Sequence, residues 1–439
     1  MISARRYRPT STRLFTWILR NTFGAFIASR YRAHGIGLEI FDTVKPPFIL
    51  VGNHSTLLDP FITNYFVPFP VHWVSSDGNM RSPIMRFLLI KLVGSIPKSK
   101  AIPDIETVNW IVEFIRKRKG VVGFYPEGQS TWDGSSLPSL VSTAKLVKLL
   151  KAPVICALSR GAYMTKPRWA YTRREGEMQI EYSLLLTPQR IKELSVEEID
   201  VLLNAAIQHD DPAWAQRQGL EFKNPKRAEC LELALYACPA CGKLQTLRSE
   251  GERISCQSCG FIAEYGEEGS FRLKKAGSRS SPAMAGMQNR EGGLLFTSLR
   301  DWDHWQREHL EALLKSDFAD SPDSPIFSDE GVRLLRGKRM DRMENLGRGR
   351  LSLNSKSISL KPVGAEELSI DLAEIDGPGV LKWNFFEFYV GKAVYRVRFD
   401  DRAASGYKYA SAMELLAAAR RTSGLHAEPE AALKPVLSP

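Results

Sequence analysis

The sequence predicts an α/β protein built on a mainly parallel sheet with helices on both of its faces. Apolar runs of strand length alternate with helical periodicity over residues 35–222, which is typical of a parallel sheet. Two Cys-x-x-Cys pairs further along predict a small metal-binding module. From Gly349 onward apolar and polar residues alternate, so we also expect an antiparallel β region at the C-terminal end.

Changes in composition divide the 439 residues into six segments. At roughly 150 residues per domain, the length alone suggests about three domains. The predicted segments are amphipathic helices over 1–34, the α/β domain over 35–225, the cysteine module over 226–275, a flexible linker over 276–294, a mainly β domain with a closing helix over 295–422, and a disordered tail over 423–439.

The elements of the α/β domain follow from short apolar runs and from helical spacing. Asp59 followed by Pro60 is typical of an N-cap residue and the first turn of a helix. Ser195, with two glutamates in the turn that follows, indicates another helix start. We expect further helices over 106–118, 140–151 and 195–209, strands over 48–51, 71–74, 121–125 and 152–158, and hairpin-like strands around 169–172 and 178–186.

In the C-terminal region we expect a short helix around Trp302, several antiparallel strands and a closing helix over 411–421. The strands are indicated by apolar residues that alternate with polar ones, as in Leu351 and Leu353. Short strands followed by one closing helix resemble, in topology, a pleckstrin-homology-like barrel.

The charge of the chain points to anionic partners. A net charge of +11 and a pI near 9.3 favour lipid headgroups, phosphorylated substrates or nucleic acid. No run of 18 apolar residues occurs, so we predict no membrane span, and Arg20 interrupts the first apolar stretch, so we expect no signal peptide. The first 38 residues hold seven arginines and no acid, with aromatic and aliphatic residues between them. Such a segment either lies in a membrane interface or docks on the protein's own core, and both alternatives stay open.

A histidine directly follows the first buried strand, in the segment Asn53-His-Ser-Thr-Leu-Leu-Asp59. The imidazole of His54 can act as a general base on a hydroxyl if a carboxylate holds its other nitrogen, and Asp59 could provide that carboxylate. Residues five apart do not share a helical face, so the segment must bend or its helix must begin near Asp59. The alternatives are a structural histidine and an aspartate that only caps the helix.

A second motif, Phe124-Tyr-Pro-Glu-Gly128, lies at the end of another buried strand, with Glu127 73 positions after His54. A turn with Pro and Gly at the carboxyl edge of a sheet exposes backbone N–H groups. Glu127 can accept hydrogen bonds from the hydroxyls of an acceptor substrate. The alternative is an ordinary turn between a strand and a helix.

Together the two motifs resemble the His-x4-Asp and Phe-Pro-Glu-Gly motifs of the glycerolipid and lysophospholipid acyltransferase family, in the same order and near the same spacing. The resemblance covers roughly residues 35–190. It extends to a basic segment with Lys98 and Lys100 and to the strand that ends at Arg160-Gly. It implies an acyltransferase-type fold, with the acceptor substrate bound by the residues Glu127, Gly128, Lys98, Lys100 and Arg160.

The resemblance also implies a mechanism. His54 removes the proton from the acceptor hydroxyl, Asp59 orients His54 and stabilises its charged form, and the hydroxyl attacks the thioester of acyl-CoA or acyl carrier protein. Backbone N–H groups are expected to stabilise the oxyanion. One departure matters: the family's arginine after this motif is replaced by Ser130. That arginine is expected to bind the acceptor's phosphate, so Lys98, Lys100 or Arg160 must do so here, or the acceptor differs from lysophosphatidic acid.

The cysteine pairs Cys238-x-x-Cys241 and Cys256-x-x-Cys259 are separated by fourteen residues. Two such turns bring four thiolates into a tetrahedron around Zn²⁺, and the glycine after each pair lets the turn bend tightly. All four ligand positions are filled, so the predicted site is structural, and the module resembles a zinc ribbon. A redox-active pair is the alternative, but it needs only one Cys-x-x-Cys.

The leading functional hypothesis is a peripheral acyltransferase on the cytoplasmic face of a membrane, with a lysophospholipid as acceptor. The alternatives are a zinc-ribbon nucleic-acid-binding protein and a catalytically inactive lipid-binding adaptor. Glutamates make the ribbon region fairly acidic, so we expect no nucleic-acid partner. His54 and Asp59 argue against an inactive adaptor. The acceptor headgroup, the acyl chain and the oligomeric state do not follow from the sequence.

Overall fold

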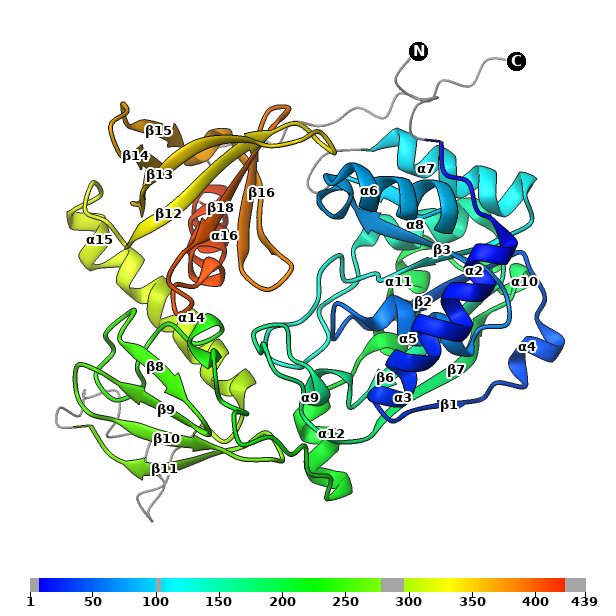
Figure 1. Ribbon diagram of the computed structural model, residues 1–439, viewed down its shortest axis with the longest axis horizontal. Helices are drawn as coiled ribbons and strands as arrows, with labels where there is room; N and C mark the ends of the chain where they lie inside the picture. The colour runs from blue at the N-terminus through cyan, green and yellow to red at the C-terminus, as the bar shows by residue number, and fades with distance from the viewer. Residues whose placement is uncertain (1–7, 100–103, 278–295, 423–439) are drawn as a thin grey trace.

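The computed structural model describes residues 8–99, 104–277 and 296–422. The α/β domain lies on one side of the molecule, and the ribbon and the C-terminal β domain lie on the other (Figure 1). The predicted tail, 423–439, lies outside the described residues, as does all of the predicted linker except residues 276 and 277.

The α/β domain is built on a seven-stranded sheet in the order β1-β7-β6-β2-β5-β3-β4. All neighbouring strands are parallel except β6 and β7, which confirms the mainly parallel sheet. The strands are β1 (Ala33–Ile36), β2 (Phe48–Gly52), β3 (Val71–Ser76), β4 (Ile96–Lys98), β5 (Val121–Phe124), β6 (Val154–Arg160) and β7 (Met178–Leu186).

Helices cover both faces of this sheet, and β2 shows why. Ile49 and Val51 belong to the apolar core on one face, whereas Phe48 and Leu50 belong to the core on the other. A strand buried on both sides in this way is an unbroken apolar run. The first core is closed by α7 (Ile105–Val112), α8 (Val141–Leu150), α10 (Pro188–Glu193) and α11 (Val196–Ile207), and the second by α3 (Ala25–Arg30), α4 (Ile40–Thr43) and α5 (Asp59–Phe66). The domain also contains the helices α6 (Pro83–Arg86), α9 (Ala162–Thr165) and α12 (Asp211–Gln218).

The N-terminal segment forms one continuous helix, in which a π-helical stretch, Arg20–Gly24, joins α2 (Arg13–Leu19) to α3. One side docks on α5, where the ring of Phe23 packs edge-on against Phe61 with centroids 5.1 Å apart. The other side leaves Leu14, Trp17 and Phe26 more than 60% exposed. Docking on the protein's own core therefore leaves one apolar side of the helix exposed, so it is compatible with the other alternative, a position in a membrane interface. In the parts of the chain that are described, no helix is long and apolar enough to cross a membrane.

The cysteine module folds as a four-stranded antiparallel sheet in the order β11-β10-β9-β8. Its strands are β8 (Leu247–Glu250), β9 (Arg253–Cys256), β10 (Ile262–Tyr265) and β11 (Phe271–Lys275). The helix α14 (Leu299–Lys315) joins it to the C-terminal domain: Trp302 is fully buried, and its indole N–H donates to the carbonyl of Ala237 (3.1 Å). The ribbon, α14 and the C-terminal domain thus share one apolar core.

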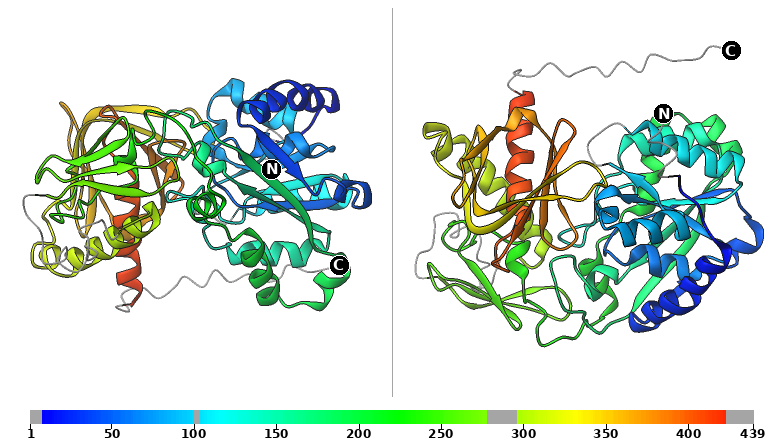
Figure 2. Two further views of the ribbon diagram at one scale, coloured as in Figure 1. Left: turned by 90° about the horizontal axis from the view of Figure 1, so that it is seen from below. Right: turned by 45° about the horizontal axis from the view of Figure 1, so that its top comes forward.

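The C-terminal domain is a seven-stranded antiparallel half-barrel in the order β15-β14-β13-β12-β18-β17-β16, with a long helix packed inside it (Figure 2). The predicted resemblance to a pleckstrin-homology-like barrel concerns the topology alone and stays a prediction. The elements are a short helix α15 (Asp317–Asp320), β12 (Phe327–Gly337), β13 (Glu344–Leu353), β14 (Ser357–Pro362), β15 (Leu368–Asp371), β16 (Ile375–Leu381), β17 (Phe385–Val390), β18 (Ala393–Phe399) and α16 (Gly406–Thr422).

Two expectations about individual strands were wrong. Residues 169–172 form turns rather than a strand, because Trp169 is fully buried in the core and donates its indole N–H to the hydroxyl of Tyr163 (2.9 Å). The β region begins at Phe327, well before Gly349. Irregular pairing in β12 between Asp329 and Val332 breaks the alternation of apolar residues, so the sequence pattern hides this strand.

Candidate active site

The loop between β2 and α5 brings His54 and Asp59 together. His54 Nδ1 lies 2.9 Å from Asp59 Oδ2, and the same oxygen accepts hydrogen bonds from the backbone N–H groups of Ser55 (2.7 Å) and Thr56 (2.9 Å). The helix begins at Asp59, as the spacing requires. The helix-cap alternative was wrong, because the carboxylate turns back to the preceding loop instead of capping the N–H groups of α5. With Nδ1 held by Asp59, the Nε2 atom of His54 is the nitrogen that can take a proton.

The pair is asymmetric in its exposure to solvent. The Asp59 side chain is completely buried, whereas 19% of the His54 side chain is exposed. Burial raises the pKa of Asp59, and the hydrogen bonds from His54, Thr56 and Ser55 oppose this rise by favouring the carboxylate. A buried carboxylate that holds one imidazole nitrogen fixes the orientation of the ring.

An aromatic stack fixes the plane of the imidazole. The ring of His54 lies parallel to that of Tyr125, with centroids 4.3 Å apart, and Tyr125 in turn stacks on Trp73 at 5.1 Å. Tyr125 comes from the second motif and Trp73 from β3, so three neighbouring strands position one side chain. No local sequence pattern indicates this role for Tyr125, the aromatic residue before Pro126.

Glu127 ties the two motifs together. Its carboxylate oxygens accept hydrogen bonds from the backbone N–H groups of His54 (2.5 Å) and Leu137 (2.7 Å), and the N–H of Thr131 donates to the carbonyl of His54 (3.0 Å). The two motifs meet because β2 and β5 are neighbouring parallel strands. Burial raises the pKa of Glu127 to about 8, although the hydrogen bonds from Leu137 and His54 favour the carboxylate and oppose this rise. Glu127 thus has a structural role, and its contact with an acceptor stays a prediction.

His54 lines a cavity of about 930 Å³. Apolar side chains from the N-terminal helix, the loop before α5, the residues after α6 and the start of α8 form much of its wall. They include Leu19, Leu57, Phe61, Leu89, Leu140 and Leu146. A cavity of this size and character suits a long hydrocarbon chain.

Two of the other candidate residues share this cavity with His54. Lys98 lies at the end of β4 and donates to the carbonyl of Ser99 (2.6 Å), and burial lowers its pKa. Gly128 turns the chain with φ of +73°, a conformation that favours glycine. Lys100 lies outside the described residues.

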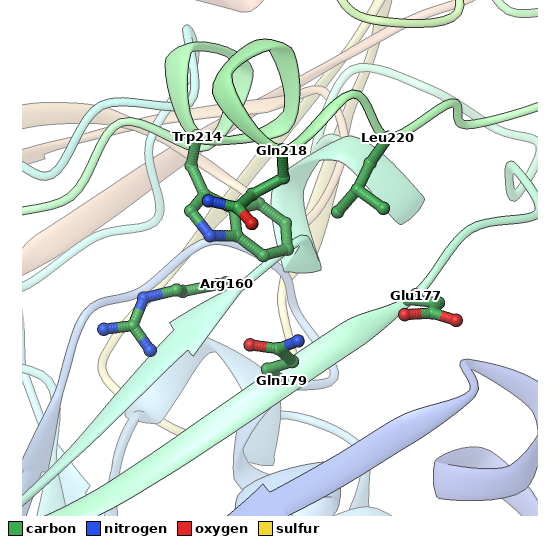
Figure 3. Close-up of a pocket in the computed structure, with 6 residues that line it drawn as sticks. All are labelled: Arg160, Glu177, Gln179, Trp214, Gln218 and Leu220. Atoms are coloured by element: carbon green, nitrogen blue, oxygen red, sulfur yellow. The ribbon is translucent and has the colours of Figure 1, made fainter.

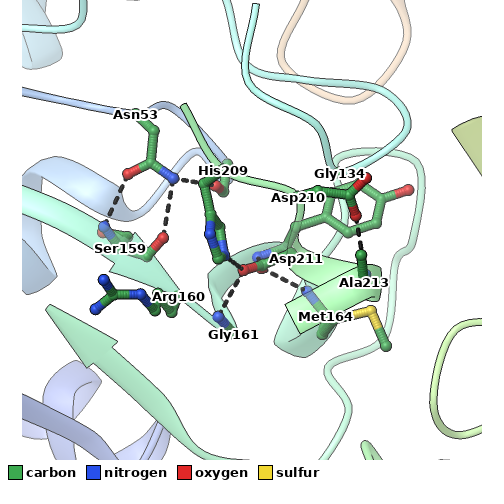
Figure 4. A network of polar contacts seen from close by, with 12 residues as sticks. Asn53, Gly134, Ser159, Arg160, Gly161, Met164, His209, Asp210, Asp211 and Ala213 are labelled. Carbon is green, nitrogen blue, oxygen red and sulfur yellow. Dashed lines mark hydrogen bonds and ion pairs between the residues drawn. The ribbon is translucent and has the colours of Figure 1, made fainter. Parts of the chain in front are cut away.

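The structure does not bring Arg160 to His54. Its side chain pairs with Glu181 at 2.6 Å and lines a separate cavity of about 370 Å³ (Figure 3). The physical reason is the alternation of side chains along β6. Ser159 is the residue that meets the loop of His54, and the side chain of the next residue, Arg160, points to the other face of the sheet. Figure 4 shows Asn53 exchanging two hydrogen bonds with the backbone of Ser159 (2.8 and 2.9 Å), which anchors the start of the loop.

A second histidine–aspartate pair lies nearby but has a different setting. His209 Nε2 is 2.6 Å from Asp211 Oδ1, and Asp211 also accepts hydrogen bonds from the N–H groups of Gly161 and Tyr163 (Figure 4). Both side chains are buried and neither lines the cavity of His54. This pair holds α12 against the end of β6.

The four cysteines form the expected cluster. Their four Sγ atoms all lie within 4.8 Å of one another. The Sγ atoms of Cys238 and Cys259 are 3.7 Å apart, and those of Cys241 and Cys256 are 3.8 Å apart. Four sulfurs at about 2.3 Å from one Zn²⁺ would be separated by about 3.8 Å, whereas a disulfide needs about 2.05 Å. The donor set and its spacing fit a tetrahedral metal ion.

The comparisons with known proteins concern the domain that holds His54. Residues 31–159 match the model of the family named Acyltransferase. This segment, called the acyltransferase-like segment below, contains both motifs. The predicted resemblance to an acyltransferase family is therefore confirmed over residues 35–159. Among solved structures, the chain is similar to the 1-acyl-sn-glycerophosphate (LPA) acyltransferase PlsC from Thermotoga maritima, with 18% identity and a TM-score of 0.39 over 44% of this chain and 76% of that one. No curated protein matches the chain.

Proposed function

We propose that the protein is an O-acyltransferase of phospholipid synthesis, which moves a fatty acyl group from acyl-CoA or acyl carrier protein to a hydroxyl of a lysophospholipid or glycerol phosphate. The observation that carries the proposal is the pair of His54 and Asp59 at the wall of a large apolar cavity. The match of the surrounding segment to the acyltransferase family supports it.

The chemistry follows from the orientation of the imidazole. His54 takes the proton of the acceptor hydroxyl as its oxygen attacks the thioester carbonyl, and Asp59 stabilises the resulting imidazolium. The new C–O bond replaces the C–S bond, and the proton passes from His54 to the departing thiolate. No covalent acyl-enzyme is needed.

The enzyme is proposed to work at the cytoplasmic face of a membrane as a peripheral protein. The exposed Leu14, Trp17 and Phe26 of the N-terminal helix support this, as do Ile84 (73% exposed) in α6 and Phe87 (57%) just after it. Backbone hydrogen bonds from Thr10 to Ile90 and from Thr12 to Leu92 join the two segments. Both segments also line the cavity of His54, so an acyl chain could enter directly from the bilayer.

Replacing Leu14, Trp17 and Phe26 together by serine is expected to reduce binding to anionic liposomes by more than about 10-fold, because the variant loses the three most exposed large apolar side chains of the N-terminal helix. Co-sedimentation with vesicles rich in anionic lipid measures this. Binding of the unaltered protein should weaken with added salt, since arginines in this segment contribute a surface electrostatic term. The matched control carries serine at Val201 and Val363, which are 67% and 85% exposed on other faces. Equal binding by the two variants would exclude this membrane-facing surface.

The proposed function is tested with purified protein, acyl-CoA and acyl carrier protein donors, and a panel of lysophospholipids together with glycerol 3-phosphate. Formation of an ester with at least one donor and acceptor is expected. A zinc ion held by Cys238, Cys241, Cys256 and Cys259 has a structural part in this proposal and takes no part in the chemistry.

A further inference from the structure

The cavity of His54 has a wall that the acyltransferase-like segment does not supply. Val380, Leu381 and Lys382, from β16 and the turn after it, line the same cavity as His54. The hairpin of β16 and β17 extends from the half-barrel toward the α/β domain (Figure 1). Residues more than 200 positions apart thus share one site.

A buried arginine links this wall to the second motif. The guanidinium of Arg168 donates to the carbonyls of Ser130 (2.7 Å) and Val380 (2.8 Å), and it lies over the ring of Trp132 at 4.2 Å. Ser130 is the position at which the family carries its arginine. Arg168 therefore brings a guanidinium to the motif from a different part of the chain, and its side chain also lines the cavity.

Arg168 has no counter-ion of its own. Only 3% of the residue is exposed, no carboxylate of the described residues lies within ion-pair distance, and its Nε–H has no acceptor there. Burial lowers the pKa of Arg168 to about 10, which still leaves it charged near neutral pH. A buried cation without a counter-ion is costly even when carbonyls accept its hydrogen bonds, so an anion bound in the cavity would stabilise it.

Lys382 adds a second cation at the same place. No carboxylate of the described chain forms an ion pair with it, and its Nζ lies 5.9 Å from the centre of the Phe385 ring. Burial, with the charges of Arg396 and Arg398, lowers the pKa of Lys382. Glu387, whose charge acts on Lys382, is already engaged by Arg81 and Arg396.

The hairpin is fixed against the α/β domain. Glu387 of β17 and Arg81 of the α/β domain form an ion pair in which both side chains are 6% exposed. Arg339, from the turn after β12, pairs with Asp104 (3.1 Å) and Glu106 (3.2 Å) beside α7. The turn that carries Lys382 is thus held at the cavity by the hydrogen bond from Arg168 to Val380 before it and by the ion pair of Glu387 with Arg81 after it.

We propose that Arg168 and Lys382 bind the phosphate of a substrate, so that the half-barrel completes the acyltransferase site and replaces the family's missing arginine. This inference rests on the proposed function. The phosphate belongs either to the acceptor lipid or to the coenzyme A of the donor, since both carry one.

The test uses Lys382→Gln in the full chain, with Lys392→Gln as the control because Lys392 is an exposed lysine in the next turn of the same half-barrel. One arm compares kcat/KM for lysophosphatidic acid and for monoacylglycerol, and the other compares acyl-CoA with a phosphate-free acyl-pantetheine thioester. In one of the two arms, Lys382→Gln is expected to lower the ratio of kcat/KM for the substrate with phosphate to kcat/KM for the substrate without it by about 10-fold or more. A loss of this size is typical of a lost charge-assisted hydrogen bond. That arm identifies the source of the phosphate. Equal losses with and without phosphate, or no loss, would overturn the inference.

A binding measurement separates this inference from the proposed function. Calorimetry with lysophosphatidic acid, below its micellar concentration, is expected to show at least about 10-fold weaker binding to Lys382→Gln than to Lys392→Gln if the acceptor's phosphate is bound. Coenzyme A serves as the probe for the donor's phosphate. Weakened binding by Lys382→Gln in a protein without transferase activity would support the phosphate site and refute the proposed function. Active protein with unaltered binding of both probes would refute the phosphate site alone.

Discussion

Replacing His54 by alanine is expected to lower acyl transfer by about 10²–10⁴-fold, because the reaction loses its general base. The fold should survive, since the backbone N–H and carbonyl of residue 54, which bond to Glu127 and Thr131, are unchanged by the substitution. Steady-state turnover with acyl-CoA and lysophosphatidic acid measures the loss. Asp59→Asn should also lower acyl transfer severely, because the imidazole loses the negative charge beside it. The loss should be smaller than in His54→Ala, because the imidazole keeps a hydrogen-bond partner.

The control for this experiment is His34→Ala, the same change at an exposed position in β1. It should leave turnover and the melting temperature close to those of the unaltered protein. Folded His54→Ala protein that retains full activity would refute the general-base mechanism.

Replacing Cys238 by serine is expected to release the metal and unfold the ribbon. Structural zinc sites of this kind contribute about 10–16 kcal/mol of apparent binding free energy near neutral pH, which is comparable to the stability of a whole domain. Because the ribbon, α14 and the half-barrel share one core, unfolding should spread beyond the ribbon. Metal analysis should find about one Zn²⁺ per chain in the unaltered protein, and limited proteolysis should cut the variant within residues 238–275.

Cys230→Ser provides a matched control, because Cys230 lies outside the cluster of four. Its zinc content and protease resistance should equal those of the unaltered protein. If freshly purified, reduced protein contains no zinc, or if Cys238→Ser retains it in full, the metal site is refuted.

The parts of the fold that depend on local pattern could be predicted from the sequence. The buried strands around Ile49 and Val122 are apolar runs, and the capping box of Ser195 and Glu198 marks the start of α11 as expected. The spacing also limits how Asp59 can reach His54: residues five apart do not share a helical face, so the contact requires a bend or a helix that begins near Asp59.

The rest depends on contacts between distant segments, which no local pattern reports. The stacking of Tyr125 on His54 arises only once β2 and β5 are adjacent. The place of Lys382 depends on how the half-barrel docks, and the burial of Arg168 depends on the same interface. Arg160 shows the converse: its strand resembles a strand of the acyltransferase family, which suggested a site residue, yet the structure places Arg160 in another cavity.

Direct transfer of the acyl group to a lipid hydroxyl is tested by the balance of the two products. Free thiol released from acyl-CoA and ester formed on lysophosphatidic acid would be measured in the same reaction, with unaltered protein and with His54→Ala. Direct transfer gives one ester for each thiol with the unaltered protein, and both products are lost together with the variant. Thiol released without ester would indicate a hydrolase and would refute direct transfer.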